Sequence, residues 1–155
     1  MTDEAKFNRF SISLKDFEKA HTFLGEANKH EYGSVVHEAL VFAAIICYFR
    51  PFTRNEKSRS ASAVSQLQLS DFGSLMPEEL SIHQKCEELR NKALAHSEFK
   101  YHPTRLNLDT GMISSTWFSL VGQVPDLGKL AALIENLIQQ CRNKRADYVW
   151  KVRST

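Results

Sequence analysis

The stretch VVHEALVFAAIICYFR, residues 35–50, decides the fold. Nearly all of its side chains are apolar, so apolar groups would lie on almost every face of a helix. Such a helix is buried by the helices around it. Gly33 and Ser34 supply a stop and an N-cap before it, and Pro51 ends it. We therefore predict a central helix from Val35 to about Arg50.

Three further helices are predicted around this one. The first runs from about Leu14 to Asn28, because its apolar side chains recur at spacings of three and four. Another opens with Pro77 and two glutamates and continues to about Ser97. The last starts at Pro125-Asp126 and carries a stripe of leucine and isoleucine. Its last turn, over residues 142–145, is basic, which is favourable at the carboxyl end of a helix.

The segments between these helices are shorter and more polar. Residues 52–74 have no apolar periodicity, and we predict a loop there, with a short helix around Ala63 to Leu69. Residues 105–108 and 112–118 alternate around Asp109-Thr110-Gly111, which is typical of a β-hairpin. The predicted fold class is therefore mainly α, an up-and-down bundle of about four to five helices with a small β-hairpin near 105–118.

Length and composition limit the class of protein. A chain of 155 residues suits a single domain, here 1–155, and a net charge of +2 excludes a strongly basic nucleic-acid binder. The three cysteines form no CxxC pair, so we do not expect structural zinc. We also expect no cofactor. The longest apolar run, Ala39 to Phe49, is shorter than the roughly 20 residues that span a bilayer as a helix. We expect a cytoplasmic protein without a membrane partner.

One motif carries chemistry. Arg90-Asn91 is followed, after four residues, by His96 at the end of a predicted helix. This arrangement resembles the signature of the HEPN superfamily, a group of helical nucleotide- and RNA-associated domains. The resemblance implies a homodimer that binds RNA or nucleotides, and in many members a metal-independent endoribonuclease. Some members are toxins or phage-defence effectors, so an antitoxin or other partner protein is a further expectation.

The residue types suit this reaction. The RNA 2′-hydroxyl would attack the adjacent phosphate, leaving 2′,3′-cyclic phosphate and 5′-hydroxyl ends. The imidazole of His96 can accept or donate a proton near neutral pH, and Arg90 can hold two phosphate oxygens. Asn91 would orient the histidine or a phosphate oxygen. On a regular α-helix Arg90 and His96 would lie about 120° apart around the axis and about 9 Å apart along it, so one helix does not bring both groups to one phosphate. The resemblance implies that a dimer places two such motifs across a shared cleft.

Two other interpretations stay open. His96 continues the apolar line of this helix, so it could be a histidine at the edge of the core, and Arg90 could pair with Glu87. The domain could also be a HEPN module without catalytic activity that binds nucleotides or RNA, or that dimerises with another protein.

Other residues are candidates for RNA contacts or for packing. The candidates for phosphate contacts are basic residues in the first loop and near the motif: Arg50, Arg54, Lys92, Lys100 and Arg105. A solvated loop is the alternative for the first two. We interpret Tyr148 and Trp150 as packing or dimer-contact residues in preference to a base-stacking platform.

Overall fold

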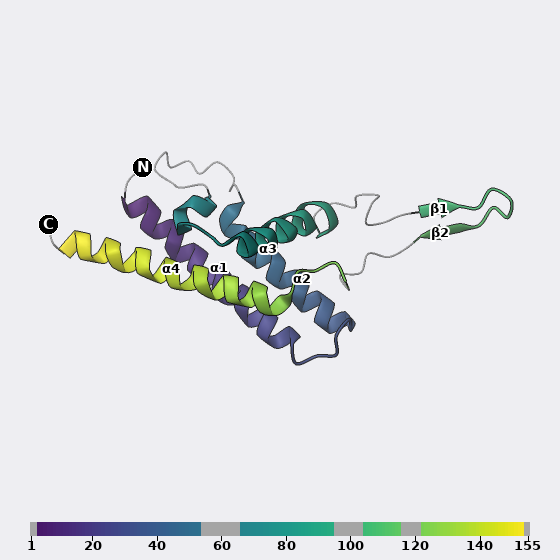
Figure 1. The fold of residues 1–155 in the computed structure, drawn as a ribbon, viewed down its shortest axis with the longest axis horizontal. Helices are drawn as coiled ribbons and strands as arrows, with labels where there is room; N and C mark the ends of the chain where they lie inside the picture. The colour runs from purple at the N-terminus through teal and green to yellow at the C-terminus, as the bar shows by residue number, and fades with distance from the viewer. Residues whose placement is uncertain (1–2, 54–65, 95–103, 116–121, 154–155) are drawn as a thin grey trace.

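The computed structural model describes residues 3–53, 66–94, 104–115 and 122–153 (Figure 1). Its elements, in chain order, are α1 (Asp3–Ala27), α2 (Val35–Phe49), η1 (Arg50–Phe52), η2 (Leu69–Phe72), α3 (Pro77–Glu88), a π-helical segment (Leu89–Leu94), β1 (Thr104–Leu106), β2 (Ile113–Ser115) and α4 (Leu127–Arg153). Successive α-helices run in alternating directions in Figure 1. The predicted mainly-α, up-and-down architecture with a small hairpin is confirmed.

Helix α1 packs along both α2 and α4, and the core lies between these three helices and the buried face of α3. The helix begins at Asp3, so the predicted start at Leu14 is wrong. The apolar stripe extends from Leu14 toward the N-terminus through Phe10 and Phe7, at spacings of four and three residues. Phe10 is buried, and the ring of Phe7 stacks on Tyr148 of α4 at 4.8 Å between centroids. Contact with α4 therefore stabilises the turns before Leu14, which the local pattern did not predict.

Helix α2 has the predicted bounds to within one residue. The Ser34 hydroxyl accepts a hydrogen bond from the backbone N–H of His37, which caps the first turn. Pro51 follows in the 3₁₀ turn η1. Within the described chain, Val35–Phe52 has the length and hydropathy of a membrane-crossing helix, although 44% of it is buried inside the molecule. A buried core helix meets the same criterion. The window is longer than the apolar run from Ala39 to Phe49 because it includes less apolar residues on both sides of that run.

Helix α4 is longer than predicted. Asp126 caps its start, because the carboxylate accepts a hydrogen bond of 2.9 Å from the N–H of Lys129. The helix continues to Arg153, so residues 142–145 lie inside it, and the basic residues of its last turn are Lys151 and Arg153. The stacking of Tyr148 on α1 explains this extension.

The connection between α2 and α3 differs from the prediction. Residues 66–68 are not helical, so the helix predicted around Ala63 to Leu69 is wrong there, and its first part lies outside the described residues. The observed 3₁₀ turn η2 begins at Leu69, where Asp71 accepts a hydrogen bond from the N–H of Gln68 and Phe72 enters the core.

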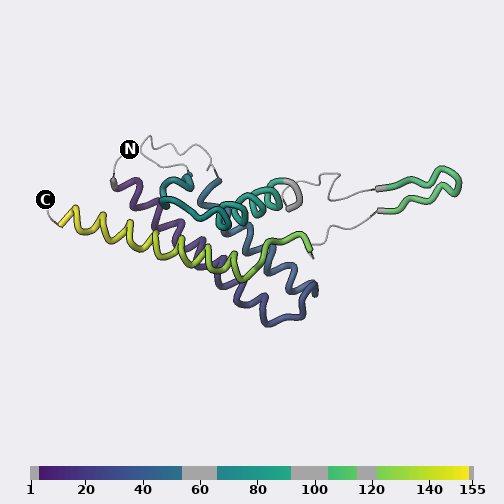
Figure 2. The backbone as a smooth tube through the Cα atoms, in the orientation of Figure 1, coloured from purple at the N-terminus to yellow at the C-terminus, as the bar shows by residue number. Residues whose placement is uncertain are grey.

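The predicted hairpin is confirmed. Strands β1 and β2 are antiparallel, with Leu106 opposite Ile113. The amide oxygen of Asn107 accepts hydrogen bonds from the N–H groups of Asp109 and Thr110, and Gly111 has the positive φ of +67° that completes the turn. In Figures 1 and 2 the hairpin projects away from the helices. Residues 116–118 of the predicted second strand lie outside the described residues.

Candidate functional site

The motif begins where the helix changes its winding. Helix α3 ends at Glu88, and Leu89–Leu94 continues it as a π-helix, so the helix predicted to about Ser97 is not α-helical over Leu89–Leu94, and residues 95–97 lie outside the described residues. Leu89 is fully buried, whereas Arg90 and Asn91 are half-buried. π-Helical turns are rare and are frequently found at functional sites. The separation expected on a regular α-helix does not apply to this segment.

Arg90 and Asn91 form a pair. Arg90 Nη1 donates a hydrogen bond of 2.6 Å to Asn91 Oδ1. The alternative partner, Glu87, forms no ion pair with Arg90, and the neighbouring Glu88 contacts Lys85 at 3.5 Å. Among the described residues, no carboxylate lies within ion-pair distance of Arg90. Within the described residues the guanidinium is therefore held by a neutral amide and not by a carboxylate.

The π-helical segment lies against α2 as well as α3. Because this segment continues α3 directly, its packing against another helix is with α2. His96, the third residue of the predicted catalytic set, lies outside the described residues, as do Arg54 and Lys100. Lys92 belongs to the π-helix by its backbone.

The other two predicted RNA contacts lie apart from Arg90. Arg50 follows α2 and forms an ion pair with Asp16 of α1 at 3.5 Å. Its backbone carbonyl also accepts a hydrogen bond from Arg9. Arg105 is exposed on β1 of the projecting hairpin (Figure 2). The structure therefore brings together Arg90 and Asn91, and no described contact joins Arg50 or Arg105 to them.

Sequence reasoning missed a buried polar pair in the core. The Tyr48 hydroxyl lies 2.8 Å from Nδ1 of His83, and the His83 ring also packs against Phe49 and Phe52. Burial lowers the pKa of His83 to about 4. The histidine that α3 itself carries is thus a neutral core residue.

Neither a metal cluster nor a known relative identifies the site. Over the described ranges, no group of three or more histidine, cysteine or acidic side chains is arranged to hold a metal ion. No family model matches the chain, and no curated protein or solved structure matches it.

Proposed function

We propose that this chain is a metal-independent endoribonuclease of the HEPN type that acts as a homodimer. The observation that carries the proposal is the Arg90–Asn91 pair, with 2.6 Å between guanidinium and amide oxygen. The pair stands at a half-buried π-helical turn and contacts no carboxylate among the described residues. A guanidinium in such a setting can bind two oxygens of one phosphate.

In the proposed reaction the RNA 2′-oxygen attacks phosphorus, and the bond from phosphorus to the 5′-oxygen breaks. His96 accepts the proton of the 2′-hydroxyl, and a second histidine, supplied by the other copy of the dimer, protonates the leaving 5′-oxygen. Arg90 stabilises the charge that develops on the phosphorane, while Asn91 holds Arg90 in place. The products are 2′,3′-cyclic phosphate and 5′-hydroxyl ends.

A second candidate uses the same residues. Arg90 and Asn91 can hold a phosphate without any proton transfer, so a non-catalytic RNA- or nucleotide-binding module fits the same observation. We favour the nuclease because the sequence places His96 shortly after this pair. A cytoplasmic toxin or phage-defence effector, restrained by an antitoxin or other partner protein, is the cellular role that belongs to this proposal.

The test is cleavage of a mixed RNA pool in the presence of EDTA, with analysis of the new ends. Wild type is compared with Arg90→Ala, His96→Ala and the control His21→Ala, which removes an exposed histidine of α1. Oligomeric state is measured on the same samples by sedimentation.

The nuclease proposal expects cyclic phosphate ends from wild type and His21→Ala, and none from the two motif variants. RNA binding without cleavage, weakened by Arg90→Ala and unaffected by His96→Ala, would instead identify the non-catalytic module. Equal cleavage by wild type and His96→Ala would overturn both.

A further inference from the structure

The positive charge of this protein is concentrated at one end of α4. Residues 142–153 contain five basic residues and one acidic residue, a net charge of +4, whereas the whole chain carries +2. The remaining residues therefore sum to −2. Arg142 of this group forms an ion pair with Glu18 of α1 at 2.9 Å. A local field of this kind attracts polyanions.

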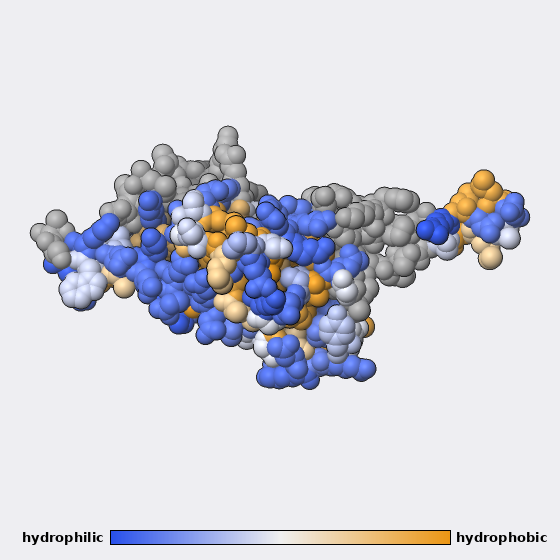
Figure 3. Space-filling model, viewed as in Figure 1, coloured by the Kyte–Doolittle hydropathy of each residue, from blue (hydrophilic) through white to orange (hydrophobic). Residues whose placement is uncertain are grey.

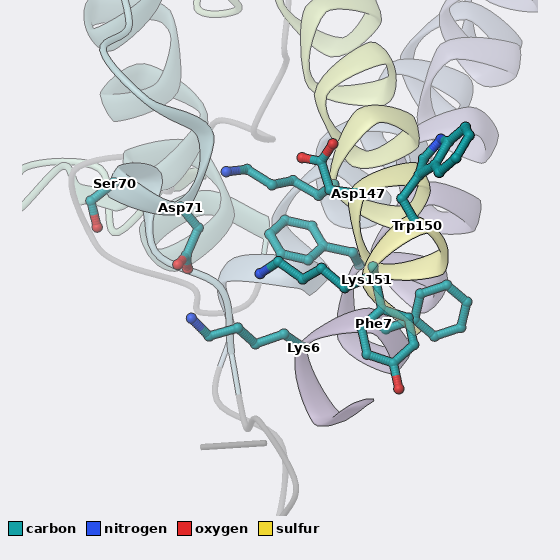
Figure 4. Close-up of a pocket in the computed structure, with 10 residues that line it drawn as sticks. Lys6, Phe7, Ser70, Asp71, Asp147, Trp150 and Lys151 are labelled. Carbon is teal, nitrogen blue, oxygen red and sulfur yellow. The ribbon is translucent and has the colours of Figure 1, made fainter. Parts of the chain in front are cut away.

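A hollow of about 560 Å³ lies where this end of α4 meets the start of α1 and the turn η2 (Figure 4). Three lysines line it, from two helices: Lys6, Lys144 and Lys151. In Figure 4 the ammonium groups of Lys6 and Lys151 are directed toward Asp71 across the hollow. Within the described chain, neither Lys6 nor Lys144 forms an ion pair.

A second hollow, of about 340 Å³, adjoins the first. Phe7 and Trp150 line both hollows, and the second adds Arg145 and Arg153. The guanidinium of Arg145 lies 5.7 Å from the centre of the Phe7 ring. Five cations and two carboxylates, Asp71 and Asp147, therefore line the two hollows, which gives a net charge of +3.

Trp150 separates the two hollows and presents most of its ring to solvent. Its exposed fraction is 72%, and Figure 4 shows the indole directed away from the hollow with the lysines. Tyr148, by contrast, stacks on Phe7. The interpretation of this aromatic pair as packing or dimer-contact residues thus fits Tyr148 as a packing residue, whereas most of the surface of Trp150 is exposed.

We infer that this surface, the two hollows on either side of Trp150, binds single-stranded RNA, with phosphates on the lysines and arginines and a base stacked on the indole. Basic grooves with exposed aromatic side chains are the usual means of binding single strands without sequence preference. The inference deepens the proposed function, because it gives that ribonuclease a surface for holding its substrate away from Arg90.

The experiment measures binding of a 12-nucleotide oligouridylate, with inorganic polyphosphate as a second probe, by fluorescence anisotropy and competition. A Trp117→Phe background leaves Trp150 as the only one of the two tryptophans, so its fluorescence reports stacking directly. The variants are Trp150→Ala, Lys144→Ala with Lys151→Ala, and Asp71→Asn. The control is Lys15→Ala, which removes an exposed lysine from α1 outside both hollows.

We expect Trp150→Ala to weaken RNA binding about tenfold and to leave polyphosphate binding unchanged, because stacking acts on bases alone. The double lysine variant weakens both probes, and Asp71→Asn strengthens both, since it retains an oxygen acceptor for Gln68 while removing a negative charge. RNA quenches the fluorescence of Trp150. Salt weakens binding of both probes.

Three outcomes would overturn the inference. They are unchanged RNA affinity in Trp150→Ala, an equal effect of Lys15→Ala, and a Trp150→Ala effect confined to oligomeric state. Arg90→Ala in the same assay separates this inference from the proposed function. If only Arg90→Ala weakens RNA binding, the α4 surface is wrong and the motif stands; if only the α4 variants do, the motif fails as an RNA contact.

Discussion

The hydroxyl of Tyr48 and Nδ1 of His83 lie 2.8 Å apart in the core, and this contact joins α2 to α3. Both side chains are buried. Burial raises the pKa of Tyr48 well above its ordinary value and lowers the pKa of His83, so both groups are neutral at pH 7. Such a polar pair is tolerated in the core because each group provides the hydrogen-bond partner that the other needs.

The first prediction concerns pH. The folded-state pKa of His83 is about 4, below the unfolded value of about 6.5, so acid protonates the unfolded chain first. The contribution of this group to the free energy of unfolding is therefore fully present above pH 6.5 and is lost as the pH falls toward 4, with about 2 kcal/mol lost by pH 5 and about 3 kcal/mol by pH 4. Urea unfolding at pH 7.5 and pH 5 measures the change.

The control is His83→Gln, which keeps a hydrogen-bonding group near Tyr48 and cannot be protonated. It should lose this share of the pH dependence while the contribution of other groups remains. The same loss of stability on acidification in wild type and His83→Gln would assign the pH dependence to other residues.

A second prediction concerns the end of α2. Arg9 of α1 is buried and donates hydrogen bonds to the carbonyls of Arg50 and Pro51, the latter at 2.7 Å. Arg9→Met would keep most of the apolar stem but leave these carbonyls without a donor, at a cost of about 2 kcal/mol in the free energy of unfolding. Urea unfolding compares it with Lys15→Met, an exposed site on the same helix. Equal stabilities for the two variants would mean that water replaces the guanidinium.

Features that depend on neighbouring residues were predictable from the sequence, and features that depend on contacts between distant residues were not. The bounds of α2 follow from Ser34 and Pro51, whose effects are local and confined to one turn. The start of α1 depends on Phe7 meeting Tyr148, 141 positions later in the chain, and no local pattern encodes that contact. The length of α4 was underestimated for the same reason.

The candidate site was predictable in part. The sequence itself makes Arg90 and Asn91 neighbours, but their hydrogen bond, and the preference of Arg90 for an amide over Glu87, depend on the π-helical winding. That winding has no simple sequence signal. Similarly, Arg50 was expected to contact RNA, and its ion pair with Asp16 depends on the packing of α1 against α2.

A third prediction tests the Arg90–Asn91 pair. Asn91→Asp would place a carboxylate against the guanidinium of Arg90, and the resulting ion pair would compete with phosphate. We expect RNA affinity to fall about tenfold in Asn91→Asp and by less in Asn91→Ala, which removes the orienting oxygen without adding charge. Anisotropy with a labelled RNA measures both. If Asn91→Asp binds RNA as wild type does, Arg90 is not a phosphate contact.

The last prediction concerns the proposed homodimer and the hairpin. Leu106 and Ile113 lie opposite each other on β1 and β2, so they share one face, and their exposed fractions are 57% and 73%. Figure 3 shows apolar surface on the hairpin, apart from the helices. Since exposed apolar surface favours association, we expect Ile113→Asp to shift the sedimentation of a dimer toward the monomer.

Ser114→Asp is the control, because it adds the same charge to the opposite face of β2 and should leave the dimer intact. Loss of the dimer in both variants would point to an effect of charge alone, and retention in both would place the dimer contact elsewhere.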